Sequence, residues 1–224
     1  MSAIEAFIFD LDGVITDTAE FHYRAWKRLA DEEGIPFTRE ENDQLRGVSR
    51  RQSLLLLLKD RVLPEDQMEA WMTRKNDYYR AFLEEVTPNN LLPGVYAFLR
   101  EARQLGLKLG LASASKNARD VIEKLGIADL FDAVGDGYSV SNSKPAPDLF
   151  IWVAGRLDAH PAQSVVFEDA EAGIEAARRG SMFAVGLGPA DRLGKAHLVL
   201  PSLDGVSADT VLKALADGAT LKTP

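Results

Sequence analysis

Near its start the chain carries an apolar stretch that ends in two acidic residues, AFIFDLDG at residues 6–13. A continuous apolar run of this length is typical of a strand that is covered on both faces. Similar runs that end in small or acidic residues occur at Leu107–Ser113, Ser164–Asp169, Phe183–Gly188 and Leu198–Pro201. We therefore expect Ala6–Asp10 and these four segments to be strands of one parallel sheet.

Helical patterns lie between the expected strands. The segment Leu92–Leu105 has Pro93 near its start, and Lys116–Leu125 follows Ser115, a good N-cap, and ends at Gly126. Strands that alternate with helices of this size indicate an α/β fold with helices on both faces of the sheet. The sequence thus predicts a doubly wound, Rossmann-like parallel sheet.

Residues 16–88 interrupt this alternation. They show almost no strand signal, and Arg, Glu, Lys, Leu and Trp recur in them at helical spacing. Within them Leu54–Leu58 is apolar on all sides, which predicts a buried helix. Because such an insertion is too long for a crossover loop, we expect two domains. Residues 1–15 and 89–224 would form the core, and residues 16–88, here called the cap, an inserted helical domain.

The composition is that of a folded globular protein: of 224 residues, 46% are hydrophobic and 27% charged. The 26 Lys and Arg against 34 Asp and Glu give a net charge of −8, which disfavours nucleic acids and membrane surfaces as partners. The absence of Cys excludes disulfides and thiolate chemistry. The N-terminus lacks the pattern of a signal peptide, and no apolar run spans a bilayer. We expect a cytoplasmic monomer.

Polar residues follow several of the expected strands. Asp10 and Asp12 come after the first strand, Ser113–Asn117 after the second, Lys144 before the third, and Glu168–Asp169 at its end. Ligands bind at the carboxyl ends of strands in an open parallel sheet, so these side chains should converge. Clustered carboxylates need a cation, and hard oxygen ligands favour Mg²⁺. A lysine with hydroxyl and backbone donors would hold an anion beside it, which predicts phosphoryl chemistry.

The order of these motifs resembles that of the haloacid dehalogenase superfamily. The segment FDLDGV at residues 9–14 looks like its first motif, Ser113 and Lys144 like its second and third, and Glu168–Asp169 like its fourth. Further segments look like those of the β-phosphoglucomutases within this superfamily: Asp17–His22, Arg46–Arg50, Arg74–Asp77, Leu111–Asn117 and Ser143–Asp148. The likeness extends from Phe7 to about Gly188.

The resemblance implies roles for the core residues. Asp10 would be the nucleophile that forms an aspartyl phosphate, and Asp12 the general acid and base. The metal site would consist of Asp10, Asp12 through its main-chain carbonyl, Glu168 and Asp169. Lys144 would offset charge on the transferring phosphoryl group.

The remaining implied residues bind the substrate. In the core, the transferring phosphate and the sugar would be held by Ser113, Ala114, Ser115 and Asn117. In the cap, Arg50 is the expected partner of the distal phosphate, the one that lies away from Asp10, because a guanidinium binds phosphate bidentately. The other cap residues implied are Thr18, His22, Gly47, Val48, Ser49, Ser53 and Lys75. In the family, Thr18 and His22 couple closure of the cap to the position of Asp12.

The activity implied by the resemblance interconverts β-D-glucose 1-phosphate and glucose 6-phosphate. Phosphorylated Asp10 would donate to the 6-hydroxyl group, and the resulting β-glucose 1,6-bisphosphate would turn round and return its 1-phosphate. Mg²⁺ and a bisphosphate primer are the cofactors expected. Closure of the cap would keep water from the acyl phosphate.

Two alternative functions remain open at this point. A sugar-phosphate phosphatase would use the same core residues and let water attack the aspartyl phosphate. A non-enzymatic phosphoacceptor domain would also contain a phosphorylatable aspartate, but it needs neither a cap nor an acid–base residue at Asp12.

Overall fold

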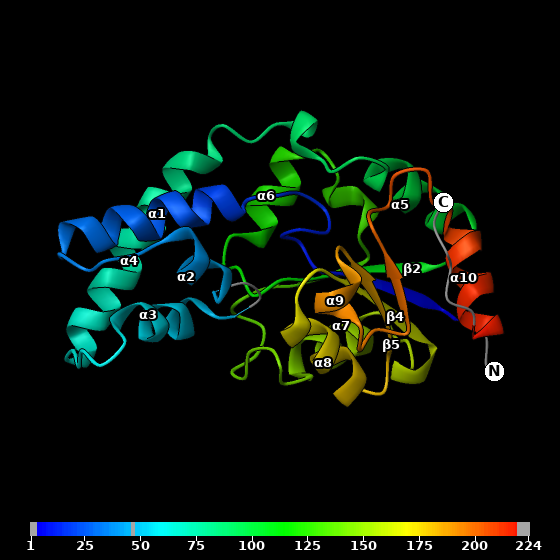
Figure 1. Cartoon of the computed structure of the whole chain (residues 1–224). Coiled ribbons are helices and arrows are strands. Elements are labelled where there is room, and N and C mark those ends of the chain that lie inside the picture. Colours follow the sequence, from blue (N-terminus) through cyan, green and yellow to red (C-terminus); the bar gives the residue numbers. More distant parts are fainter. Residues whose placement is uncertain (1–3, 46–47, 219–224) are drawn as a thin grey trace.

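A six-stranded parallel sheet forms the centre of the core in a computed structural model that describes residues 4–45 and 48–218 (Figure 1). The strands are β1 (Ala6–Phe9), β2 (Lys108–Ala112), β3 (Ala133–Gly135), β4 (Ser164–Glu168), β5 (Phe183–Leu187) and β6 (Leu198–Leu200). They lie in the order β3-β2-β1-β4-β5-β6, and every neighbouring pair is parallel. From β1 the chain builds the sheet outward in both directions, through β2 to β3 on one side and through β4 to β6 on the other. Doubly wound folds bind ligands at the point where this direction changes. The predicted fold class is confirmed.

Helices cover both faces of the sheet. On one face lie α5 (Val95–Gln104), α6 (Ala118–Lys124) and α10 (Ala208–Asp217), and on the other α7 (Asp148–Arg156), α8 (Glu171–Arg179) and α9 (Ala190–Leu193). Three short 3₁₀ turns complete the core: η1 (Pro88–Asn90), η2 (Ala128–Leu130) and η3 (Pro161–Gln163). Over the described ranges, the structure contains no helix with the length and apolar character needed to cross a membrane.

Alternate side chains of β1 enter opposite cores, which explains why the strand is apolar throughout. Phe7 and Phe9 pack on the side of α5, whereas Ile8 packs on the side of α7. On the α5 side four aromatic rings meet: the centroid of Phe167 lies 4.6 Å from that of Phe9 and 5.3 Å from that of Phe98. The two-sided burial predicted for this strand is confirmed.

The aromatic cluster provides a test of where stability resides. Phe98 is 1% exposed, so Phe98→Ala should lower the free energy of unfolding by about 3–5 kcal/mol, because it removes apolar burial and leaves a cavity. Tyr96→Ala on the same helix, where the side chain is 48% exposed, should change it by less than about 0.5 kcal/mol. Urea unfolding followed by circular dichroism measures both, and equal losses would contradict this assignment of the core.

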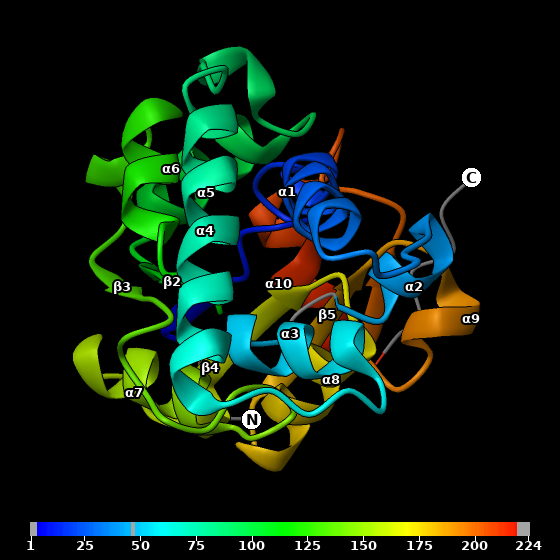
Figure 2. The ribbon, with the colours of Figure 1, turned by 90° about the vertical axis from the view of Figure 1, so that its left-hand side faces the viewer.

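The described part of the cap contains four helices: α1 (Ala19–Glu32), α2 (Arg39–Asp43), α3 (Arg50–Leu58) and α4 (Glu65–Leu83). Figure 1 shows them together on the left, beyond the carboxyl ends of the strands, and in Figure 2 they face the viewer. Trp26, Leu54 and Trp71 belong to a cluster of buried side chains that is separate from both cores of the sheet. A separate core is typical of an inserted domain. The domain boundaries at residues 15 and 88 stay a prediction.

The two connections between cap and core run side by side. Thr16 in the first connection forms a β-bridge with Leu91 in the second. The Thr16 hydroxyl also donates a hydrogen bond of 2.7 Å to the carbonyl oxygen of Asn90. Paired connections of this kind are where a cap can pivot.

Two local predictions are wrong, and one strand has no counterpart among the predicted elements. Leu54–Leu58 is not buried on all sides, since Leu55 and Leu56 are 43% and 37% exposed; α3 lies on the outside of the cap and turns only one face to α4. Strand β3 was not expected, because three small or apolar residues carry too little pattern. Helix α6 begins two residues later than expected, with Asn117 in the N-cap position, because Ser115 instead accepts a hydrogen bond from the Asn117 N–H within the preceding turn.

Candidate active site

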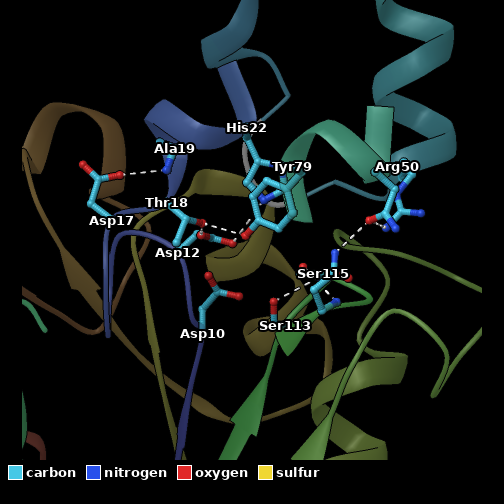
Figure 3. A network of polar contacts seen from close by, with 12 residues as sticks. Asp10, Asp12, Asp17, Thr18, Ala19, His22, Arg50, Tyr79, Ser113 and Ser115 are labelled. Carbon is cyan, nitrogen blue, oxygen red and sulfur yellow. Dashed lines mark hydrogen bonds and ion pairs between the residues drawn. The ribbon is translucent and has the colours of Figure 1, made fainter. Parts of the chain in front are cut away.

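The polar residues that follow different strands converge at one edge of the sheet. Asp10 follows β1, Ser113 follows β2, and Glu168 ends β4. Figure 3 shows Asp10 and Ser113 at the strand ends, with His22, Tyr79 and the other labelled side chains of the cap above them. The convergence expected from parallel strands is thus observed.

Lys144 lies buried between two carboxylates. Its Nζ atom is 2.6 Å from Oδ1 of Asp10 and 2.7 Å from Oε2 of Glu168, and its side chain is 1% exposed. Burial by itself lowers the pKa of Lys144, but the negative charges of Asp10 and Glu168 outweigh it and raise that pKa. A permanent positive charge is therefore held beside Asp10, where an approaching phosphate needs it.

Asp10, Glu168 and Asp169 form an acidic triad. One carboxylate oxygen from each lies within 4.8 Å of those from the other two, and all three residues are buried. Burial and the charge of Asp10 raise the pKa of Glu168 to about 8. Three hard oxygen donors in a buried, negatively charged site are what a Mg²⁺ ion requires, so the residues present fit this ion.

Two glycines allow the triad to pack. Gly13 has φ +78°, and a Cβ atom there would lie 2.3 Å from the Oδ2 atom of Asp169. A Cβ atom on Gly173 would lie 2.1 Å from the Oε2 atom of Glu168. Both separations are too short for any side chain, so each acid has a glycine against it.

Asp12 is held by side chains that come from the cap. The Thr18 hydroxyl donates a hydrogen bond to Oδ1 of Asp12, and the Tyr79 hydroxyl lies 3.1 Å from the Thr18 hydroxyl (Figure 3). Partial burial and the negative charge of Asp10 raise the pKa of Asp12 to about 7. Near neutral pH this carboxyl group can thus both give and take a proton, as a general acid and base must.

His22 of the cap lies near the other carboxylate oxygen of Asp12. The Nε2 atom of His22 is 4.0 Å from Oδ2 of Asp12, and its Nδ1 atom is 2.8 Å from the Nζ atom of buried Lys75. Burial and the charge of Lys75 hold the pKa of His22 well below its usual range. A charged Lys75 can only donate to Nδ1, which would place the imidazole proton on Nε2, facing Asp12.

A cavity between cap and core brings most of the predicted residues together. It is lined by Asp10, Asp12, His22, Val48, Arg50, Ser53, Lys75, Ser113, Ala114, Ser115 and Asp169. Ser49 and Lys144 line an adjoining cavity that shares Arg50 and Ala114 with the first. Thr18, Asn117 and Glu168 are buried and contact Asp12, Ser115 and Lys144, respectively. Gly47 lies outside the described residues.

Sequence reasoning missed several residues of the site. Lys116 lines the cavity, and Tyr79 stacks on His22 with ring centroids 4.1 Å apart. Asn76 accepts hydrogen bonds from Arg50 and Asn117, which are 26 and 41 residues away in the sequence. Spacing along one helix gives no signal for such contacts between cap and core.

The turn after β3 also contacts this site. The Gly137 N–H donates to the Ser115 carbonyl oxygen at 3.1 Å, and the ring centroid of Tyr138 lies 4.6 Å from Nζ of Lys116. The turn thus packs against the segment Ser113–Asn117, which we expect from the sequence to bind the substrate.

Comparisons with known proteins agree with this architecture. Residues 4–180 match the family model of haloacid dehalogenase-like hydrolases. The chain is 42% identical over 201 residues to a β-phosphoglucomutase of Bacillus subtilis, covering 88% of this chain and 89% of that protein. The crystal structure of a β-phosphoglucomutase from Clostridium difficile superposes with a TM-score of 0.93 at 40% identity, covering 96% and 98% of the two chains. A phosphorylated carbohydrates phosphatase of Thermotoga maritima is 32% identical and covers 95% and 98%.

Proposed function

The chain belongs to the haloacid dehalogenase-like hydrolase family, and from this premise we propose that it is a β-phosphoglucomutase. It would be an isomerase that interconverts β-D-glucose 1-phosphate and glucose 6-phosphate through an aspartyl phosphate and β-glucose 1,6-bisphosphate. The similarity to the Bacillus subtilis and Clostridium difficile β-phosphoglucomutases over most of the chain supports this proposal.

One observation in the structure carries the proposal. The cavity has a group that can donate to an anion on each side, because Ser113 from the core and Arg50 from the cap both line it. A substrate with phosphates on two carbons needs a partner for the distal phosphate while the other is transferred, and a guanidinium suits this role. Water-dependent removal of a single phosphate does not require such a partner.

The proposed reaction starts with Asp10 phosphorylated. As the 6-hydroxyl oxygen of β-glucose 1-phosphate bonds to phosphorus, the bond from phosphorus to the Asp10 oxygen breaks, and the hydroxyl proton passes to Asp12. The bisphosphate then turns round, and the Asp10 carboxylate attacks its 1-phosphate. The bond from phosphorus to the sugar oxygen breaks, and Asp12 returns its proton to that oxygen. Lys144 beside Asp10 offsets the negative charge throughout.

The acidic triad would hold a Mg²⁺ ion together with the main-chain carbonyl of Asp12. When bound, this ion would offset negative charge on the phosphoryl oxygens. Asp10 and Glu168 of the triad also contact Lys144, so the ion and the lysine would both lie beside the transferring group.

The metal site gives a testable prediction. Asp169→Asn should raise the Mg²⁺ concentration for half-maximal activity by at least about tenfold, because it removes one anionic oxygen ligand. Asp217→Asn, at the exposed end of α10, is the matched control and should leave that concentration unchanged. Mg²⁺ titrations of initial rates compare the variants, and an unaltered half-saturation in Asp169→Asn would contradict the assignment of this ligand.

A coupled assay tests the substrate and the primer. We expect glucose 6-phosphate, detected by its oxidation with glucose-6-phosphate dehydrogenase, to form from β-glucose 1-phosphate when Mg²⁺ and a trace of β-glucose 1,6-bisphosphate are present. The α-anomer should react far more slowly. Equal rates with both anomers, or with neither, would overturn the proposed substrate.

The proposal also includes the oligomeric state, the location and the partners that the sequence led us to expect. We expect the enzyme to act as a monomer in the cytoplasm, with a small sugar phosphate and neither nucleic acid nor membrane as its partner. Size-exclusion chromatography with light scattering tests the monomer directly, and a stable dimer would contradict it.

A further inference from the structure

Asn76 of helix α4 joins the cap to the core through a single oxygen atom. Its Oδ1 atom accepts a hydrogen bond of 2.8 Å from Nη2 of Arg50, the first residue of α3 in the cap. The same oxygen accepts a hydrogen bond of 2.9 Å from Nδ2 of Asn117, the N-cap residue of α6 in the core. Two donors from different parts of the protein thus converge on one neutral acceptor.

The identity of the atoms follows from the chemistry of the three side chains. A guanidinium has donors only, so the atom of Asn76 that faces Arg50 must be the oxygen. Because that oxygen also faces Asn117, the atom that Asn117 presents must be its nitrogen. Arg50 and Asn117 therefore both direct an N–H group at the same position, which an acceptor oxygen occupies.

The neutral amide of Asn76 does not balance the positive charge of Arg50. Arg50 is half-buried, and within residues 4–45 and 48–218 no carboxylate forms an ion pair with it. Burial lowers the pKa of Arg50, which shows that the guanidinium has lost part of its hydration. A charged acceptor binds such a group about twice as strongly as a neutral amide does. An anion that enters the cavity is thus favoured over Asn76.

We propose that the Asn76 side-chain oxygen occupies the position of one oxygen of the distal phosphate, and that substrate binding exchanges the two. This inference rests on the proposed function, because it assigns Arg50 and Asn117 to a sugar phosphate. Asn76 thus acts as a placeholder for the phosphate: before binding, its oxygen accepts the hydrogen bonds of the cap donor and of the core donor. On binding it yields both of them to the phosphate.

A neutral amide suits this exchange. A carboxylate in its place would form an ion pair with Arg50 and compete with the phosphate for the same donors. An apolar side chain would leave both donors to water and would not compete at all. The two substitutions should therefore change affinity in opposite directions, whereas loss of a merely structural contact would weaken binding in both.

Isothermal titration calorimetry with glucose 6-phosphate and Mg²⁺ tests the exchange. We expect Asn76→Asp to weaken binding by about tenfold or more, since an ion pair must be broken, and Asn76→Ala to tighten it by about two- to fivefold. Gln67→Glu makes the same change from amide to carboxylate at an exposed position of α4 and is the matched control, with unchanged affinity expected. Thermal melting of each variant monitors folding.

Opposite changes in affinity support the placeholder. Weaker binding in both Asn76 variants, or unchanged affinity in Asn76→Asp, overturns it, the first because it indicates that Asn76 either has a structural role or itself donates to the ligand. Steady-state kinetics add an independent readout, since the exchange predicts that Asn76→Asp raises KM more than it lowers kcat. Carrying out the calorimetry in an Asp10→Asn background prevents turnover, so a protein that released inorganic phosphate in place of transferring it would refute the mutase and still test this inference.

Discussion

Asp10→Asn is expected to reduce turnover of β-glucose 1-phosphate by at least about 10³–10⁴-fold, the largest effect of any single substitution. The amide has nearly the shape of the carboxylate but cannot attack phosphorus. The substitution also removes one carboxylate oxygen from the acidic triad. In addition, Lys144 loses an anionic partner, since its Nζ atom lies 2.6 Å from Oδ1 of Asp10. Initial rates in the coupled assay measure the loss, and intact mass spectrometry after incubation with substrate should find no phosphorylated protein.

Asp17→Asn is the control for this substitution. Asp17 lies on the same connection but is exposed, and its Oδ1 atom accepts a hydrogen bond from the Ala19 N–H that an asparagine can also accept. We expect this variant to keep at least about half of the activity, as surface substitutions usually do. Full activity of Asp10→Asn would refute the covalent mechanism.

Asp12→Asn should have the second largest effect, a loss of about 10²–10⁴-fold in kcat with sugar phosphates. The amide can still hydrogen-bond to Thr18, so the connection between Asp10 and the cap should keep its geometry. What disappears is the group that takes the proton of the attacking hydroxyl and later returns it to the leaving oxygen. Initial rates with β-glucose 1-phosphate measure the loss.

A phosphoryl donor whose leaving group needs no proton separates this role from a structural one. Transfer from acetyl phosphate to Asp10 releases acetate, so we expect Asp12→Asn to form phosphorylated protein at a rate close to that of the unchanged enzyme. Mass spectrometry follows the reaction. If phosphorylation by acetyl phosphate slowed as much as sugar turnover, Asp12 would act by shaping the site and not by moving a proton.

Most of the core could be predicted because strands such as β1 and β4 are buried on both faces. Phe7 and Ile8 enter different cores, so neither position tolerates a polar residue and the apolar run is continuous. The surface of the cap gives no such signal. Leu55 and Leu56 continue an apolar run although they are exposed, because only packing against α4 decides which side of α3 is covered.

Some residues of the candidate site could likewise be predicted from the sequence, and others could not. Residues that directly follow strands, such as Asp10 and Ser113, could be placed together because parallel strands end at one edge. The contact between Asn76 and Asn117 joins α4 to the start of α6, and its existence depends on how the cap lies on the core. No spacing within one element predicts a contact of this kind, so both it and the stacking of Tyr79 on His22 required the three-dimensional structure.

The central claim is that the phosphoryl group of Asp10 passes to a sugar hydroxyl in preference to water. Phosphorus NMR of a reaction that contains the protein, Mg²⁺, β-glucose 1-phosphate and a trace of β-glucose 1,6-bisphosphate measures this choice directly. If the phosphoryl group passes to the sugar, the signal of β-glucose 1-phosphate is replaced by that of glucose 6-phosphate, with little inorganic phosphate, and this is the result that we expect. Inorganic phosphate as the main product would contradict it and would make the protein a sugar-phosphate phosphatase with the same nucleophile.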